Sequence, residues 1–115
     1  IVIAGRVYNA SLSYLGDLPY VANLNLPNSL VVSPEGNQLY TLRGNQLTVY
    51  DISGTSAPFP EVGAPVTITV GESGDSIYPR QLRISQDGST LFASYLIRPQ
   101  FSLPDYYRLA VIPVP

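Results

Sequence analysis

Residues 27–40 read PNSLVVSPEGNQLY, and the same pattern returns 52 residues later, where residues 79–92 read PRQLRISQDGSTLF. Without a gap, one Pro, two Leu, one Ser and one Gly are identical. Conservative pairs stand at three further positions: Val32 and Ile84, Glu35 and Asp87, Tyr40 and Phe92. Self-similarity at a fixed period is typical of repeat architectures. Each copy predicts a strand, a Ser-x-acidic-Gly turn and a second strand, because a carboxylate bonds nearby amides and Gly adopts the left-handed conformation.

A hairpin follows the first copy directly. Residues 38–43 and 46–52 are strand-like, and Gly44-Asn45 stands between them. A Gly-Asn pair accepts the positive backbone angles of a tight two-residue turn, so the register of the two strands is well specified. Gly and Pro, 20 of the 115 residues, interrupt the chain every few residues and leave no interval for an amphipathic helix. The short runs between them, rich in Val, Ile, Leu, Tyr and Thr, predict an all-β fold of antiparallel strands.

The residue types that are missing exclude several kinds of chemistry. The chain has no Cys, His, Met or Trp, and all six of its cations are Arg against eight carboxylates, for a net charge of -2. Without a thiolate or an imidazole there is no disulfide, no cysteine nucleophile, no Ser-His-Asp triad and no typical zinc site. Without Lys there is no Schiff base and no P-loop. We therefore expect no cofactor, no metal and no catalysis by this segment alone.

Charge and hydropathy also limit the partners. The six Arg are scattered along a mildly acidic chain and form no basic stripe, which argues against nucleic-acid binding. The longest uninterrupted apolar run, Leu109–Ile112, is far shorter than the ~20 residues of a membrane helix, so no membrane-spanning segment is expected. The chain starts without Met and ends in an apolar run, and we expect it to be a piece of a larger protein.

Residues 30–53, LVVSPEGNQLYTLRGNQLTVYDIS, resemble one blade of the seven-bladed β-propellers whose repeats read Ser-Pro-Asp-Gly, then a Leu-Tyr-Val strand, then a strand ending in Asp-Ile or Asp-Val. These are the YVTN and LVIVD repeat proteins and the wider lactonase-like family, with a WD40-like architecture. The resemblance covers residues 24–115 and weakens toward the N-terminus. It implies two to three antiparallel four-stranded propeller blades, an incomplete propeller, with the strand before Ser-Pro-Glu-Gly innermost.

The resemblance also implies a place for each strand and divisions of the chain. The implied inner strands are residues 29–32 and 81–84, and the second strands are residues 38–42 and 90–95. The third strands are residues 46–52 and 108–114. The outer strands are residues 64–70 and 20–26. The N-terminal segment contains Arg-Val-Tyr-Asn, which is similar to Thr-Val-Tyr-Asp of the third strand. Residues 1–23 would therefore be the remnant of a preceding blade, residues 24–75 one blade and residues 76–115 the next.

The two copies differ at one place. Where the first has Gly44-Asn45, the second has about ten additional residues, and residues 96–106 are expected to form a loop. Loops of this length on a tight scaffold commonly have a function. Two interpretations stay open: the loop folds back over the edge of its own blade, or it is a contact surface for another chain. The candidates for partner binding are the apolar and aromatic residues in and beside it: Tyr95, Ile97, Phe101, Leu103, Tyr106 and Tyr107.

Carboxylates are the remaining candidates for chemistry. Glu72 with Asp75, or Glu61 with either, could meet at a loop mouth as an acid–base pair, which needs a separation of about 5 to 10 Å. Most of the eight acids fall in turns, where solvation or local bonding accounts for them. We apply that local explanation to Glu35 and Asp87, with metal binding as its alternative.

Two further features concern surfaces. Tyrosine is the most abundant aromatic residue, with nine Tyr against three Phe, and Tyr40 and Tyr50 lie on predicted strands where packing is the usual role. Asn9-Ala10-Ser11 matches the N-glycosylation pattern, so Asn9 is a glycosylation candidate if the protein is secreted by a eukaryote.

The sequence favours a non-catalytic binding or scaffold module, part of a β-propeller that mediates protein–protein contact. Its partners would be other protein chains or the remaining blades of the same propeller, and its location extracytoplasmic: periplasmic, cell-surface or secreted. The alternative is a fragment of a lactonase-like or dehydrogenase-like propeller enzyme whose active site lies mostly in other blades. A third possibility is an independent β-sandwich with an incidental repeat, which predicts that the two Ser-x-acidic-Gly turns lie at opposite ends of the molecule.

Overall fold

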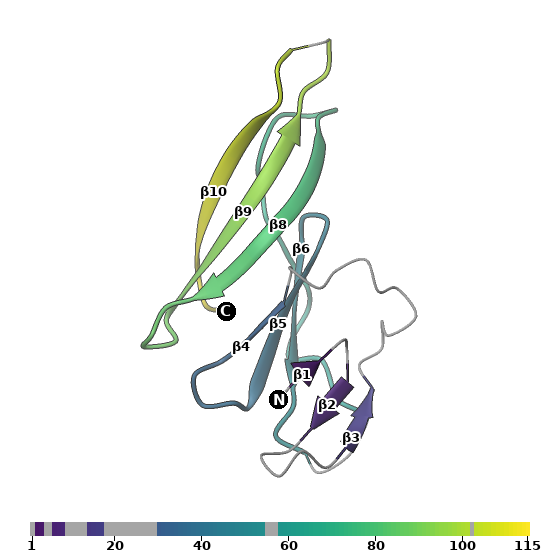
Figure 1. Ribbon diagram of the computed structural model, residues 1–115, viewed down its shortest axis with the longest axis vertical. Coiled ribbons are helices and arrows are strands. Elements are labelled where there is room, and N and C mark those ends of the chain that lie inside the picture. The colour runs from purple at the N-terminus through teal and green to yellow at the C-terminus, as the bar shows by residue number, and fades with distance from the viewer. Residues whose placement is uncertain (1, 4–5, 9–13, 18–29, 55–57, 102) are drawn as a thin grey trace.

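The computed structural model describes residues 2–3, 6–8, 14–17, 30–54, 58–101 and 103–115. Within these ranges the chain forms ten strands and no helix, which confirms the predicted all-β class (Figure 1). The strands are β1 (Val2–Ile3), β2 (Arg6–Tyr8), β3 (Tyr14–Asp17), β4 (Leu30–Val32), β5 (Gln38–Arg43), β6 (Gln46–Asp51), β7 (Val66–Thr67), β8 (Ser76–Ile84), β9 (Thr90–Arg98) and β10 (Tyr106–Pro113). They form three antiparallel sheets, which we call sheet A (β1-β2-β3), sheet B (β4-β5-β6-β7) and sheet C (β10-β9-β8).

The hairpin of β5 and β6 has the predicted position and turn. Gln38 pairs with Asp51 at its open end, and Arg43 pairs with Gln46 next to the turn. Gly44 has a φ of 59°, a left-handed conformation that Gly adopts without steric strain. The central residues of both strands are buried, which places the hairpin in the middle of the core. The predicted two-residue connection is therefore confirmed.

The two sequence copies form the same strand–turn–strand unit. Leu30 of β4 pairs with Thr41 of β5, and 52 residues later Leu82 of β8 pairs with Ala93 of β9. In both turns the serine N–H donates to the carbonyl oxygen of the residue that begins the next strand, at 2.9 Å in the first copy and 2.8 Å in the second. The turn glycine has a φ of 77° in each copy. Both predicted turns are confirmed.

Sheet B lies between the other two sheets (Figure 1). One of its faces packs on sheet C, in a cluster that includes Tyr40 and Leu47 of sheet B and Leu82 of sheet C. The opposite face, which carries Tyr50, packs on residues of sheet A that include Val2. Because successive residues of a strand point to opposite faces, the central strands of a three-layer stack are apolar on both sides. The core therefore consists of two layers, one on each side of sheet B.

The insertion is the main difference from the sequence prediction. The loop expected over residues 96–106 is shorter than predicted, because β9 continues to Arg98 and β10 already begins at Tyr106. β8 starts at Ser76, earlier than the predicted inner strand, and its additional residues pair with the end of β9. The first copy lacks the insertion, so comparison of the two sequence copies did not reveal the extension. The extra residues lengthen sheet C into a ribbon, whose tip projects at the upper end of Figure 1.

The two Ser-x-acidic-Gly turns lie next to each other. A Cβ atom placed on Gly88 would stand 3.4 Å from Cδ of Pro34, and Figure 1 shows both turns on the same side of the molecule. An independent β-sandwich with an incidental repeat predicted that these turns lie at opposite ends. They do not, and sheets B and C are stacked in the same orientation.

The outer strand of sheet B is shorter than predicted. Sheet B has four strands in chain order, but its fourth, β7, is short. Sheet C has three strands within the described residues. The outer strand predicted over residues 20–26 and the glycosylation candidate Asn9 lie outside the described residues.

Candidate functional site

One face of sheet C carries apolar side chains along β10 and the neighbouring part of β9, most of them exposed. Val111 of β10 pairs with Phe92 of β9, and Tyr107 pairs with Leu96, so each pair projects to one side of the sheet. These residues and Leu109 alternate along their strands, which places all five on the same side. We call these five residues the outer face of sheet C. The opposite face of the sheet packs on sheet B.

The corresponding positions of sheet B are buried. Once the insertion is taken into account, Leu109 and Val111 correspond to Leu47 and Val49, 62 residues earlier. Leu47 is 0% exposed and Leu109 is 60% exposed, while Val49 and Val111 are 7% and 62% exposed. Sheet C covers this face of sheet B, whereas no described residue covers the outer face of sheet C. Within the described residues, equivalent positions thus differ in burial because sheet B has a neighbouring sheet on that side and sheet C does not.

The partner-binding candidates named from the sequence fall into two groups. Tyr95 and Ile97 are fully buried in the core between sheets B and C, and Tyr106 is partly buried against it. Their side chains point inward because the lengthened β9 and β10 continue the alternation of the sheet. The candidates with exposed side chains are Phe101, Leu103 and Tyr107.

Sequence reasoning missed most of the outer face. Leu109 and Val111 were read only as members of a third strand, although their correspondence with Leu47 and Val49 was available from the aligned repeats. The alignment shows that these positions are apolar in both copies. It does not show which copy carries a sheet on that side, because burial depends on the neighbouring element.

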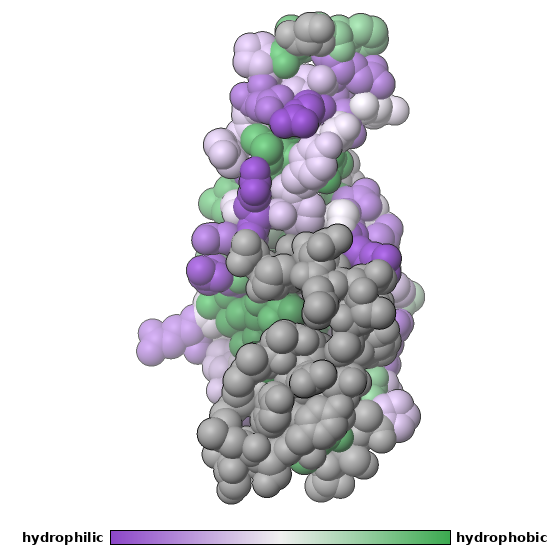
Figure 2. Space-filling model, turned by 45° about the vertical axis from the view of Figure 1, so that its right-hand side comes forward, coloured by the Kyte–Doolittle hydropathy of each residue, from purple (hydrophilic) through white to green (hydrophobic). Residues whose placement is uncertain are grey.

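The tip of the ribbon, residues 99–101 and 103–105, is fastened at its base. The Asp75 carboxylate accepts hydrogen bonds from the N–H of Gln100 at 3.3 Å and from the N–H of Glu72 at 2.9 Å. Beyond this anchor Phe101 is 89% exposed and has a φ of 62°, a left-handed conformation that is uncommon for a bulky residue. Figure 2 shows apolar atoms at this upper end of the molecule. Strained and exposed side chains of this kind occur at contact sites.

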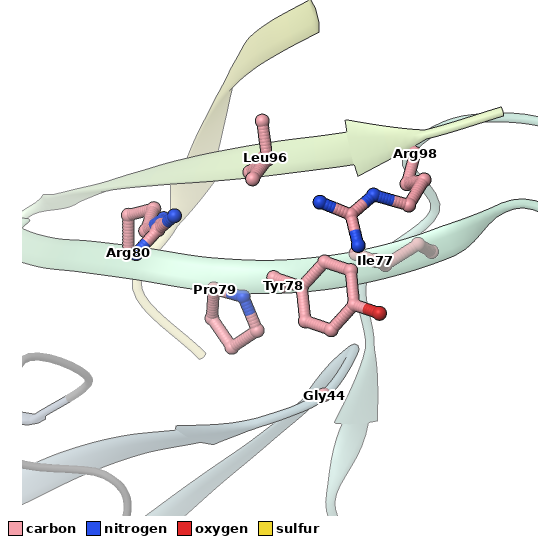
Figure 3. A pocket seen from close by; sticks show the side chains of 7 residues that line it. All are labelled: Gly44, Ile77, Tyr78, Pro79, Arg80, Leu96 and Arg98. Carbon is pink, nitrogen blue, oxygen red and sulfur yellow. The ribbon is translucent and has the colours of Figure 1, made fainter. Parts of the chain in front are cut away.

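A hollow of about 550 Å³ lies beside β8, between the tip of the β5–β6 hairpin and the ribbon (Figure 3). Arg98 stands over the Tyr78 ring, 5.6 Å from its centroid, and bonds to the Asp105 carboxylate at 3.3 Å. This carboxylate, by hydrogen bonding and by its charge, raises the pKa of Arg98. Arg80 lies at the other end of the hollow, and the lining contains no carboxylate. The residues that line the hollow therefore offer no acid–base pair of side-chain carboxylates.

The candidate acids are divided between two places. Glu72 and Asp75 belong to one turn, and the two Asp75 oxygens accept the N–H of Glu72 within the turn and the N–H of Gln100 at the ribbon tip. Glu61 lies at the edge of sheet B, where it bridges to Tyr50. Asp75 therefore holds two loops together, and Glu61 belongs to a different part of the fold. In the described part of the chain no three His, Cys, Asp or Glu side chains gather as a metal site.

Asp87 has the local role that the sequence predicted. Its Oδ1 accepts hydrogen bonds from the hydroxyl of Ser85 at 2.6 Å, from the hydroxyl of Ser89 at 2.7 Å and from the N–H of Ser89 at 3.0 Å. These bonds, the Ser85 hydroxyl first, lower the pKa of the Asp87 carboxyl to about 2. All three bonds favour the ionised form, so the Asp87 carboxylate stabilises the turn.

This turn predicts a pH dependence of stability. A carboxyl whose pKa is lower in the folded than in the unfolded chain stabilises the fold fully above the unfolded value, close to 3.8 for this residue, and the stabilisation is lost as the pH falls toward about 2. We expect unfolding in urea to become easier from pH 4 to pH 2 in the native chain and to change less in Asp87→Asn. A carboxyl ¹³C titration by NMR with an ordinary midpoint for Asp87 would contradict the prediction.

The described part of the chain has no helix that is long and apolar enough to cross a membrane. Comparisons of the chain with protein-family models, with curated proteins and with solved structures find no match. The basis for a functional proposal is therefore the geometry of the sheets and of the ribbon tip.

Proposed function

We propose that the chain is a non-catalytic scaffold module, a segment of a β-propeller-like stack, that binds protein through the outer face of sheet C and through the ribbon tip. One observation carries the proposal: Leu109 and Val111 occupy the positions at which Leu47 and Val49 are covered by the next sheet. The occupant of the outer face is accordingly another sheet of the same kind, contributed by a further part of the protein or by a partner chain.

The stacking of the described sheets supports this assignment. Sheets A, B and C follow one another in chain order and in space, and each neighbouring pair shares an apolar layer. The adjacent turns of sheets B and C give both sheets one orientation. In a stack of this kind each unit buries its apolar face only when a neighbour is present, so the unit at the end exposes that face.

The ribbon tip supports a second contact. Phe101 and Leu103 are both exposed at the end of a ribbon that Asp75 and the Arg98–Asp105 pair hold in place. Aromatic residues on a preorganised loop are frequent anchors of protein interfaces, because they bury a large area with few rotatable bonds. The tip therefore provides an apolar contact that is separate from the outer face.

The proposal predicts association through the outer face. We expect the isolated chain to form assemblies larger than 12.5 kDa by light scattering, and the double variant Leu109→Arg, Val111→Arg to return to that mass. Burial of two Arg side chains in an apolar interface costs more free energy than the burial of the apolar area provides. Val62→Arg is the matched control, because Val62 is also exposed and apolar but lies in the connection between β6 and β7. A monodisperse 12.5 kDa monomer of the unaltered chain at high concentration would overturn the proposal.

A further inference from the structure

The outer edge of β6 is occupied by a following segment of the same chain. The N–H of Val62 donates to the Val49 carbonyl at 2.8 Å, and the N–H of Ile68 donates to the Asn45 carbonyl at 2.7 Å. Between these bonds Val66 pairs with Leu47. Residues 60–68 thus cover the edge of β6 along most of its length, and the main-chain groups of that edge are bonded.

The corresponding edge of β10 is open in the described part of the chain. The order of sheet C ends at β10, and residues 107, 109 and 111 stand 62 residues after Asn45, Leu47 and Val49. β10 is eight residues long, and exposed apolar side chains alternate along it. A long exposed edge with unpaired N–H and C=O groups is a template for pairing with another strand.

We propose that the outer edge of β10 binds an extended strand of a partner polypeptide, which pairs with it as residues 60–68 pair with β6. This site consists of main-chain groups, so it is separate from the side-chain contact of the outer face. Addition of a strand to a sheet edge takes its affinity from backbone hydrogen bonds and its selectivity from the side chains opposite. The side chains of β10 therefore indicate which strand is preferred.

One position sets a charge preference. In sheet B, Gln46 lies opposite Thr67 and its amide donates to the Thr67 hydroxyl at 2.9 Å. The residue of β10 that corresponds to Gln46 is Arg108, which is exposed and whose guanidinium lies 5.5 Å from the centroid of the Tyr106 ring. Opposite charges across a strand pair stabilise it, whereas like charges weaken it. The preferred strand therefore has apolar residues around an acidic residue that faces Arg108.

The test uses three fluorescent peptides with the sequence of residues 60–70, PEVGAPVTITV, that carry Thr67→Glu, Thr67→Lys or no change. Binding to the 115-residue chain is measured by fluorescence anisotropy. We expect the Glu peptide to bind more tightly than the Lys peptide by about 2- to 10-fold. In the chain variant Arg108→Glu the order of the two peptides reverses. Equal binding of both peptides to the unaltered chain, or an unchanged order in the variant, would overturn the acidic preference.

A fourth peptide separates edge pairing from attraction of charge alone. It carries Thr67→Glu and is N-methylated at the positions of Val62 and Ile68, whose N–H groups donate to β6. Loss of two hydrogen bonds is expected to weaken binding about 10-fold. Unchanged binding would overturn the edge proposal but leave the outer-face proposal standing. If the double variant Leu109→Arg, Val111→Arg left the assembly unchanged, the outer-face proposal would be overturned and the edge proposal would stand.

Discussion

Leu47→Ala is expected to lower the free energy of unfolding by about 2–5 kcal/mol, whereas Leu109→Ala lowers it by less than about 1 kcal/mol. The two residues occupy corresponding positions of β6 and β10. Leu47 is fully buried in the layer between sheets B and C, so truncation leaves a cavity there. Leu109 is mostly exposed, and its truncation removes contacts only with the residues around it on the face. The difference between the two values measures the effect of a covering sheet.

Urea unfolding followed by circular dichroism measures both values, with linear extrapolation to water. It is done at a protein concentration at which the chain is monomeric, since association through the outer face would add to the value for Leu109. Equal losses in the two variants would contradict the burial described here. A large loss for Leu109→Ala that appears only at high concentration would instead support stacking on the outer face.

Tyr95→Phe is expected to raise the free energy of unfolding by about 1–2 kcal/mol, an unusual sign for a core substitution. Tyr95 is fully buried between sheets B and C, and its hydroxyl has no hydrogen-bond partner among the described residues. Burial also raises the pKa of its hydroxyl to about 12. Removal of the hydroxyl abolishes the free energy that is needed to desolvate it and leaves the ring in place.

Tyr40→Phe is the matched control for this prediction. The Tyr40 ring is also buried in the same layer, but its hydroxyl donates to Oε1 of Gln38 at 2.8 Å. The loss of this bond is expected to lower the free energy of unfolding by about 0.5–1.5 kcal/mol, so the two variants have opposite signs. The same sign and size in both would show that the Tyr95 hydroxyl has a partner in solution, such as a bound water.

Local sequence signals predicted the elements of sheets B and C well. The Gly44-Asn45 turn, the pairing of β5 with β6 and both Ser-x-acidic-Gly turns follow from residue types within a few positions of each other. The lengthened strands of sheet C did not follow, because Ser76–Pro79 pair with residues about twenty positions away, and most of those partners belong to the insertion that the first copy lacks. Apolar residues in an insertion were therefore read as a loop, although Tyr95 and Ile97 are core residues.

By itself, the sequence determined the all-β class, the turns and the alternation that gives each strand two faces, because these depend on backbone conformation and on neighbours along the chain. It placed apolar residues at Leu47 and at Leu109 alike. Only the stacking of the sheets made the first a core residue and left the second on the surface. The physical reason is that apolar area is removed from water by a second surface, and a strand pattern does not specify whether that surface is present. The candidate contact face therefore follows from the stacking of the sheets. The repeat indicates that its proposed occupant is another sheet of the same kind.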